Sequence, residues 1–246
     1  MGLLLLPFVV VSGCAEPGQR DSQPMLTADQ RYPQSREADG RSSGIRQVSG
    51  RSFSNSGAKD EQAPETYRVK FTTTAGEFMI EVHRDWSPNG ADRFYSLVKH
   101  GFFDDCAFFR AVSGFMVQFG IGSTPDKNFG WEDIADDDRA SKSNQRGFVT
   151  FAKTARPNSR STQVFINYGN NARLDADGFT PFGKVIGGME AVDSINQEYG
   201  EAPSQLQGVI KQRGNSILQE QFPNLDYILK AEIETPAGVE TVGGIQ

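Results

Sequence analysis

One arginine and one glutamine stand eight residues apart inside an apolar stretch of this chain. Arg110 and Gln118 lie there among large Phe, Val and Met residues, which favour β-strands. An arginine held among apolar side chains can act as a permanently charged hydrogen-bond donor in a site that excludes water. On one uninterrupted strand the two polar side chains would share a face, whereas a break or bulge at Gly114 would divide the stretch or change that face. The stretch alone is equally compatible with a functional site and with a core hairpin that carries two surface polar residues.

Other chemistries find little support in the composition. The two histidines, His83 and His100, and the two cysteines, Cys14 and Cys106, are far apart, and neither histidine has a Cys or His partner at zinc-ligand spacing. No catalytic triad or Cys-His pair is evident, so we expect neither a metal nor a cofactor. The formal net charge is −6, and residues 15–63 are neutral. The acidic balance therefore belongs to the rest of the chain and argues against nucleic acid as a partner.

Residues 1–14 have the pattern of an export signal. Their apolar run is too short to span a bilayer, which takes about 20 residues, but suits the hydrophobic region of a secretory signal. It leads into Val11-Ser12-Gly13-Cys14, which resembles a bacterial lipobox and implies a lipid on Cys14. We therefore expect a signal peptide with a lipobox, and an exported, membrane-anchored lipoprotein of the periplasm or cell envelope. A plain cleaved signal or a structural or misassigned start stays open, because no Lys or Arg precedes the apolar run.

The rest of the chain divides into a tether, a folded domain and a tail. Residues 15–64 are rich in Ser, Arg, Gln, Gly and Asp and too poor in apolar residues to offset chain entropy, so we interpret them as a disordered linker. Residues 65–231 are expected to fold, with a core at 66–200. The C-terminal extension, 201–231, is interpreted as helical and packed on the core, or else as a docking segment for a partner. Residues 232–246 are interpreted as a flexible tail.

The folded domain contains mostly strand patterns. Apolar and polar residues alternate on both sides of Thr74-Ala75-Gly76, which predicts a hairpin. Ser87-Pro88 predicts the start of a helix that ends at Gly101, and a second helix is expected from Met189 through Ile195. Many short strands with two helices indicate a mainly β fold, a closed antiparallel barrel capped by two α-helices.

Three separated motifs identify the fold more closely. The first is Phe-x-Arg-x-Val-x-x-Gly-Phe-x-x-Gln-x-Gly around Arg110, the second is Pro-Asn-Ser followed by Gln-x-Phe-Ile-Asn within residues 147–167, and the third is Phe182-Gly183-Lys184-Val185. Together they make the chain, from about residue 66 to 195, resemble the cyclophilins, the peptidyl-prolyl cis-trans isomerases, in their bacterial branch. The resemblance implies that the barrel has eight strands.

The resemblance also implies a set of site residues. Arg110 matches the catalytic arginine, and Gln118 matches the glutamine that holds the substrate backbone. The residues matching substrate-binding positions are Phe115, Met116, Ala152, Lys153, Gln163, Phe165, Leu174 and Phe179. Three positions depart from the usual pattern: Phe109 replaces a histidine, Arg173 replaces a tryptophan that contacts cyclosporin in many members, and Phe179 aligns roughly with a pocket histidine. Weak inhibition by cyclosporin is therefore expected.

The implied activity fits these residue types. Rotation about an X-Pro bond is slow because it breaks amide resonance, with a barrier of about 18–20 kcal/mol. A guanidinium that donates to the prolyl nitrogen stabilises the twisted state more than the planar one. We therefore expect a monomeric peptidyl-prolyl cis-trans isomerase that acts on proline-containing peptides and unfolded proteins and assists folding outside the cytoplasm. The alternative is a low-turnover module, an envelope chaperone or scaffold, that binds proline-containing segments in the same groove.

Overall fold

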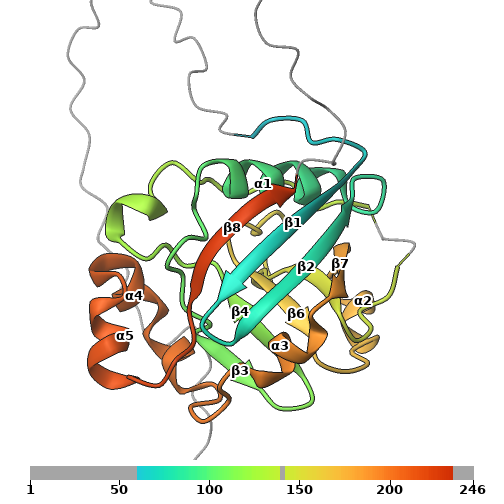
Figure 1. The fold of residues 1–246 in the computed structure, drawn as a ribbon. Helices are drawn as coiled ribbons and strands as arrows, with labels where there is room; N and C mark the ends of the chain where they lie inside the picture. The colour runs from blue at the N-terminus through green and yellow to red at the C-terminus, as the bar shows by residue number, and fades with distance from the viewer. Residues whose placement is uncertain (1–59, 139–141, 235–246) are drawn as a thin grey trace, which may run out of the picture. The chain divides into compact units, whose positions relative to one another are not determined.

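The computed structural model describes residues 60–138 and 142–234 (Figure 1). The predicted signal peptide with Cys14, residues 15–59 of the predicted linker, and residues 235–246 of the predicted tail lie outside the described residues. The strands are β1 (Thr66–Thr73), β2 (Gly76–His83), β3 (Arg110–Val112), β4 (Met116–Phe119), β5 (Phe148–Phe151), β6 (Val164–Asn167), β7 (Pro181–Gly187) and β8 (Ile228–Glu234). The helices are α1 (Pro88–Lys99), α2 (Arg173–Ala176), α3 (Met189–Ser194), α4 (Gln207–Arg213) and α5 (Ser216–Gln221), with 3₁₀ helices η2 (Pro125–Asn128) and η3 (Ala202–Leu206).

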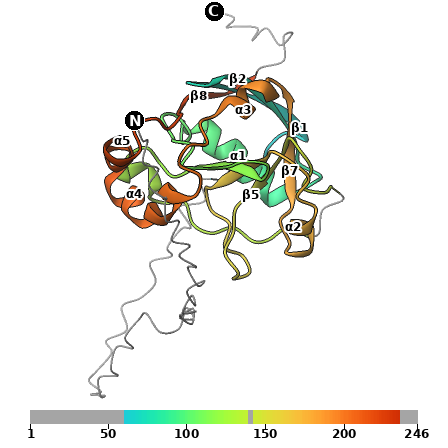
Figure 2. The same ribbon diagram turned by 90° about the horizontal axis from the view of Figure 1, so that it is seen from below.

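The eight strands form one antiparallel sheet in the order β3-β4-β6-β5-β7-β2-β1-β8. The sheet curls on itself (Figures 1 and 2). Its edge strands are β3 and β8, and an isolated bridge between Ala107 and Tyr227 joins the segments that precede them. The predicted mainly β, eight-stranded antiparallel architecture is confirmed, although in the described residues the two edges meet through this bridge rather than through a continuous ladder.

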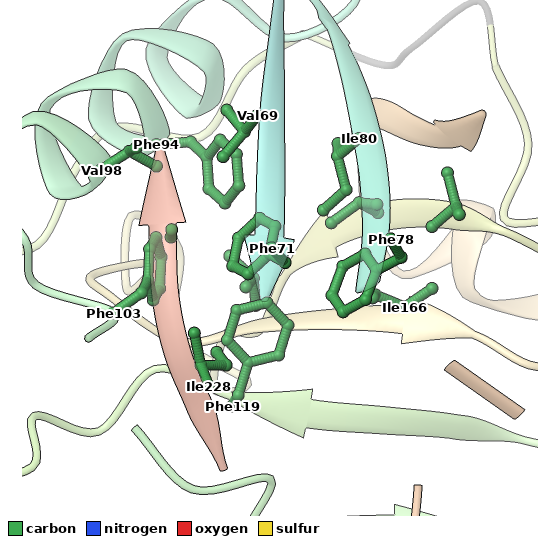
Figure 3. Close-up of a cluster of buried hydrophobic side chains, with 14 of the residues drawn as sticks. Val69, Phe71, Phe78, Ile80, Phe94, Val98, Phe103, Phe119, Ile166 and Ile228 are labelled. Carbon is green, nitrogen blue, oxygen red and sulfur yellow. The ribbon is translucent and has the colours of Figure 1, made fainter. Parts of the chain in front are cut away.

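Phenylalanine side chains fill the space that the sheet encloses (Figure 3). Phe71 of β1 stacks on Phe78 of β2, with ring centroids 4.9 Å apart. Phe103 and Phe119 lie 6.1 and 5.8 Å from the ring of Phe71, and Phe94 of α1 lies 5.4 Å from Phe103. Each of these five side chains is buried. The alternation seen in β1 and β2 thus supplies one apolar face, which α1 helps to cover.

The helices α1 and α3 lie at opposite ends of the β1–β2 hairpin. At the start of β1, the hydroxyl of Tyr67 donates a hydrogen bond of 2.7 Å to the carbonyl of Ala91 in α1. At the hairpin turn, the hydroxyl of Ser194 in α3 donates one of 3.1 Å to the carbonyl of Ala75. Both predicted helices are therefore present, and in the described residues the short helices α2, α4 and α5 accompany them.

The N-terminus of α1 is capped by a residue from a distant loop. The helix starts at Ser87-Pro88 as predicted, but the Ser87 hydroxyl makes no capping bond and donates to the carboxylate of Asp137. Asp137 itself accepts the backbone N–H groups of Asn89 at 2.9 Å and Gly90 at 3.1 Å. It also pairs with buried Arg160 at 2.9 Å. An anion is favoured at a helix N-terminus. The Asp137 carboxylate therefore stabilises the start of α1 and holds its own loop against the helix.

A second hydrophobic cluster holds the C-terminal helices against the sheet. Helices α4 and α5 lie together on the side of the domain opposite α2 (Figures 1 and 2). Phe109 contributes to this cluster, just before β3, and Ile210 contributes from α4. The buried members are Ala107, Phe109, Ile121, Ile210, Ile217, Leu218 and Leu225. The extension after residue 200 is thus packed on the core, the first of its two interpretations.

The folded part of the chain extends past both predicted boundaries. Residues 60–64, assigned to the disordered linker from their composition, lie against α1: Asp60 pairs with Arg93 at 2.6 Å, and Ala63 is buried. At the other end, β8 continues to Glu234 and pairs with β1, although the sequence predicts a flexible tail from residue 232. The extension is therefore helical only in part, because its last residues complete the sheet.

Candidate active site

The β3–β4 hairpin places Arg110 and Gln118 opposite each other. They are direct partners in the register, as are Val112 and Met116. Residues directly opposite on antiparallel strands project from the same face. The turn between the strands contains Gly114 at φ +69°, a conformation that glycine adopts without steric cost. The predicted break at Gly114 is therefore a hairpin turn, and the shared face comes from cross-strand pairing.

Arg110 and Gln118 line a cavity of about 480 Å³. The strands β3, β4 and β6, the residues after β5, and α2 contribute to its walls. All ten predicted catalytic and substrate-binding residues line it: Arg110, Phe115, Met116, Gln118, Ala152, Lys153, Gln163, Phe165, Leu174 and Phe179. The structure thus brings together in one cavity every residue that the resemblance selected, while their individual roles stay predictions.

Apolar side chains form one part of the cavity wall. Phe165 of β6 meets Phe179 edge to face, with ring centroids 5.9 Å apart. Met116 of β4 is buried, and the half-buried side chains of Phe115 and Leu174 complete this surface. A small apolar ring would be held here by burial of its surface, which contributes about 25 cal/mol per Å².

A chain of hydrogen bonds runs from Arg110 through three glutamines. Arg110 Nη1 donates to Gln118 Oε1 at 3.2 Å, Gln118 Nε2 donates to Gln163 Oε1 at 2.8 Å, and Gln163 Nε2 donates to Gln207 Oε1 at 3.0 Å. On its other side, Arg110 Nη2 donates to the carboxylate of Glu201 at 2.5 Å. A guanidinium has five N–H groups, so these two bonds leave donors for a ligand.

Cationic side chains outnumber anionic ones along the cavity. Arg110, Lys153, Arg156 and Lys211 line it, against Asp133. Asp133 pairs with Arg156 at 3.3 Å. Arg110 and Lys153 are in turn paired with Glu201 and Asp136, which do not line the cavity. Their guanidinium and ammonium groups have several N–H donors each, which suit the carbonyl oxygens of a peptide backbone.

Phe109 and Arg173, two of the residues that depart from the usual family pattern, have well-defined surroundings. Phe109 is 1% exposed and belongs to the second hydrophobic cluster instead of the cavity lining. Arg173 is exposed at the start of α2, and its guanidinium lies 4.7 Å from the centre of the Phe115 ring. The guanidinium of Arg110 lies 5.8 Å from the same ring, so Phe115 is within cation–π distance of both arginines.

The sequence did not reveal the polar residues that complete the site. Glu201, Gln207 and Lys211 come from the segment after α3, far along the chain from Arg110. They stand among other polar residues of a partly helical segment, where no spacing distinguishes them. The further lining residues absent from the prediction are Asp133, Thr154, Arg156, Ser159, Ser161, Gln207 and Lys211.

Cys106 is not part of the cavity. Its sulfur lies 3.3 Å from the carbonyl oxygen of Phe102 and 3.1 Å from that of Ile121, either of which can accept the single S–H hydrogen. Burial raises the pKa of the thiol to about 12. The reactive thiolate is therefore disfavoured. Within residues 60–138 and 142–234, no three His, Cys, Asp or Glu side chains gather as a metal site, and no helix has the length and apolar character of a membrane span.

The fold and the arginine-lined cavity agree with comparisons to known proteins. The profile of the family "cyclophilin type peptidyl-prolyl cis-trans isomerase/CLD" matches residues 68–214, and the chain belongs to this family of isomerases. The chain is 35% identical over 133 residues to human peptidyl-prolyl cis-trans isomerase-like 3, covering 52% of this chain and 81% of that protein. It is 32% identical over 152 residues to peptidyl-prolyl cis-trans isomerase A of Dickeya dadantii, covering 60% and 80%.

A solved structure supports the same fold. The crystal structure of a cyclophilin-type isomerase of Cryptosporidium parvum superposes with a TM-score of 0.50 at 21% sequence identity. The match covers 69% of this chain and 98% of that chain. Because the match covers almost all of that chain, the remaining residues of this chain have almost no counterpart in it.

Proposed function

We propose that this isomerase accelerates rotation about X-Pro bonds by using Arg110 to stabilise the twisted amide. The observation that carries the proposal is that the Arg110 guanidinium shares one cavity, of about 480 Å³, with a wall of apolar side chains. As the bond twists, the prolyl nitrogen loses amide resonance and becomes a hydrogen-bond acceptor. A guanidinium that donates to this nitrogen stabilises the twisted state selectively, and only such selective stabilisation raises the rate.

The remaining cavity residues are proposed to hold the substrate during this rotation. Phe115, Met116, Phe165, Leu174 and Phe179 would enclose the prolyl ring and exclude water, which strengthens the field of the guanidinium. Gln118 is proposed to hold the peptide backbone through its side chain, and Ala152 and Lys153 are proposed to pair with it through their own main-chain groups. Gln163 would lie at the rim of the pocket. Proline-containing peptides and unfolded proteins are the substrates that follow from this arrangement.

Replacement of Arg110 by alanine tests the catalytic role. Wild type, Arg110→Ala and Arg68→Ala would be compared on an Ala-Pro peptide in a protease-coupled assay. Arg68 is the matched control, because it is also a strand arginine paired with a carboxylate, Glu81, at 3.1 Å but stands outside the cavity. We expect Arg110→Ala to lower kcat/KM by about 10²–10³, the usual effect of removing one preorganised donor, and Arg68→Ala to leave it unchanged. Equal rates for all three proteins would favour the binding-module alternative.

We also propose that the protein works outside the cytoplasm, in a bacterial cell envelope, held to a membrane by a lipid on Cys14. The support is the sequence of residues 1–14, with its apolar run and the lipobox-like residues before Cys14. Metabolic labelling with a palmitate analogue, in the wild type and in Cys14→Ser, tests this. We expect labelled protein in the membrane fraction only for the wild type; undiminished labelling of Cys14→Ser would contradict the proposal.

A further inference from the structure

The hydrogen-bond chain of the active site begins and ends in one short segment that follows the barrel helix α3. Glu201 accepts from Arg110 at one end, and Gln207 accepts from Gln163 at the other. We propose that residues 201–207 are a built-in clamp of the catalytic machinery and that Glu201 is the positioning residue for Arg110. This inference rests on the proposed catalytic role of Arg110.

The backbone of the clamp is fixed directly beside Arg110. The N–H of Ala111 in edge strand β3 donates to the carbonyl of Gly200 at 3.2 Å. Glu201 then stands at the N-terminus of η3, and its carbonyl accepts the hydroxyl of Ser204 at 2.7 Å. Pro203 in the same turn is buried. The main chain at Glu201 is thus fixed beside β3, and from there the carboxylate, 55% exposed, reaches the guanidinium of Arg110.

The second hydrophobic cluster anchors the clamp to the strand that carries Arg110. Phe109 and Arg110 are consecutive, and Phe109 is buried in this cluster while Arg110 lines the cavity. Ile210, 1% exposed in α4, packs in the same cluster three residues after Gln207. The phenylalanine that replaces the usual histidine therefore supplies the apolar contact on which the clamp segment rests, and links its position to that of Arg110.

The chemistry of the chain gives every member one orientation. Arg110 can only donate, so Gln118 must present its oxygen to Arg110 and its amide nitrogen to Gln163, which in turn presents its nitrogen to Gln207. At the other end the Glu201 carboxylate can only accept, and it forms a charge-assisted bond, the stronger kind. Because both ends of the hydrogen-bond chain are fixed, the Arg110 guanidinium is held in one position before the substrate binds. A catalytic group has to be positioned in this way in order to act on the bound substrate.

The variant Glu201→Ala tests the clamp by its effect on kcat, and not by its effect on KM alone. We expect Glu201→Ala to lower kcat by about tenfold with KM changed less than about twofold, because the interaction lost acts on the twisted state while the apolar wall still binds the peptide. Glu201→Gln keeps an acceptor but not the charge, so its loss should be smaller, about threefold. Gln207→Leu should also lower kcat, by freeing the far end of the chain. Glu220→Gln is the control, an exposed carboxylate on α5 that pairs with Arg213 at 3.3 Å.

A double variant separates positioning from a general structural effect. In an Arg110→Ala background, Glu201→Ala should cause no further loss, because its effect passes through the arginine. Additive losses, a rate equal to wild type for Glu201→Ala, or a higher rate caused by release of Arg110 would each overturn the clamp. If Arg110→Ala is slow while Glu201→Ala is normal, only the clamp fails. If Arg110→Ala keeps the wild-type rate, the proposed function and the clamp fail together.

Discussion

Replacement of Phe109 by alanine should remove a large part of the stability of the domain. The side chain is 1% exposed and packs in the second hydrophobic cluster with Ile121, Ile210 and Leu218. Burial of a Phe side chain is worth roughly 1.5–3 kcal/mol, and the cavity left behind raises the cost of Phe→Ala to about 3–5 kcal/mol. Against a typical unfolding free energy of about 5–15 kcal/mol, this is a substantial fraction.

Urea unfolding followed by circular dichroism measures this effect. With a slope near 2 kcal/mol per molar, the midpoint of Phe109→Ala should fall by roughly 2 M relative to wild type. Phe129→Ala is the matched control, since it removes the same atoms from a side chain that is 70% exposed. The control should change the free energy of unfolding by no more than about 0.5 kcal/mol.

The result that would refute the reasoning is a small effect at position 109. A loss below about 1 kcal/mol would mean that the site collapses around the missing ring or that α4 and α5 add little to folding. A changed slope with an unchanged midpoint would instead indicate that the helices unfold separately from the sheet.

Three other measurements follow from particular contacts. Asp137→Ala breaks a buried ion pair with Arg160, whose side chains are 4% and 3% exposed, so the free energy of unfolding should fall by about 3–5 kcal/mol, while Asp138→Ala, at an exposed position, should cost little in the same denaturation experiment. In a Cys14→Ser variant at pH 8, Cys106 should resist a thiol reagent until the protein unfolds, because burial raises its pKa to about 12 and keeps the thiol protonated; rapid labelling of the native protein would contradict this. Cyclosporin should inhibit weakly, because exposed Arg173 replaces the usual tryptophan, and Arg173→Trp should strengthen inhibition; nanomolar inhibition of the wild type would show the expectation wrong.

The residues of the cavity could be predicted because they belong to short motifs that resemble those of a known family. Arg110 and Gln118 belong to one hairpin whose turn contains Gly114, and cross-strand pairing places them on one face. The motif near Gln163 supplies the neighbouring strand β6, which pairs with β4. Once these short segments are recognised, the sheet register brings their side chains together.

The C-terminal contributions could not be predicted because they depend on distant partners. In β8 the buried residues Ile228 and Ala231 are three positions apart, a spacing that favours a helix over a strand. The cause is a register shift opposite Thr72 and Thr73 of β1, which breaks the twofold alternation. The role of Glu201 likewise could not be predicted from its neighbours in the sequence, because Arg110 comes close to it only in the folded chain.

The position of β8 also sets the order in which the chain can fold. β1 pairs with β2 on one side and with β8 on the other. Both edges of β1, the first strand in the chain, are therefore paired only when β8, the last strand in the chain, is present. Until residues 228–234 leave the ribosome, β1 presents an unpaired edge, the kind of surface on which chains aggregate. Contacts between such distant segments also slow folding. A nascent chain of this isomerase therefore completes its own sheet only after synthesis has passed Arg110 and Gln118 by more than half of the described domain.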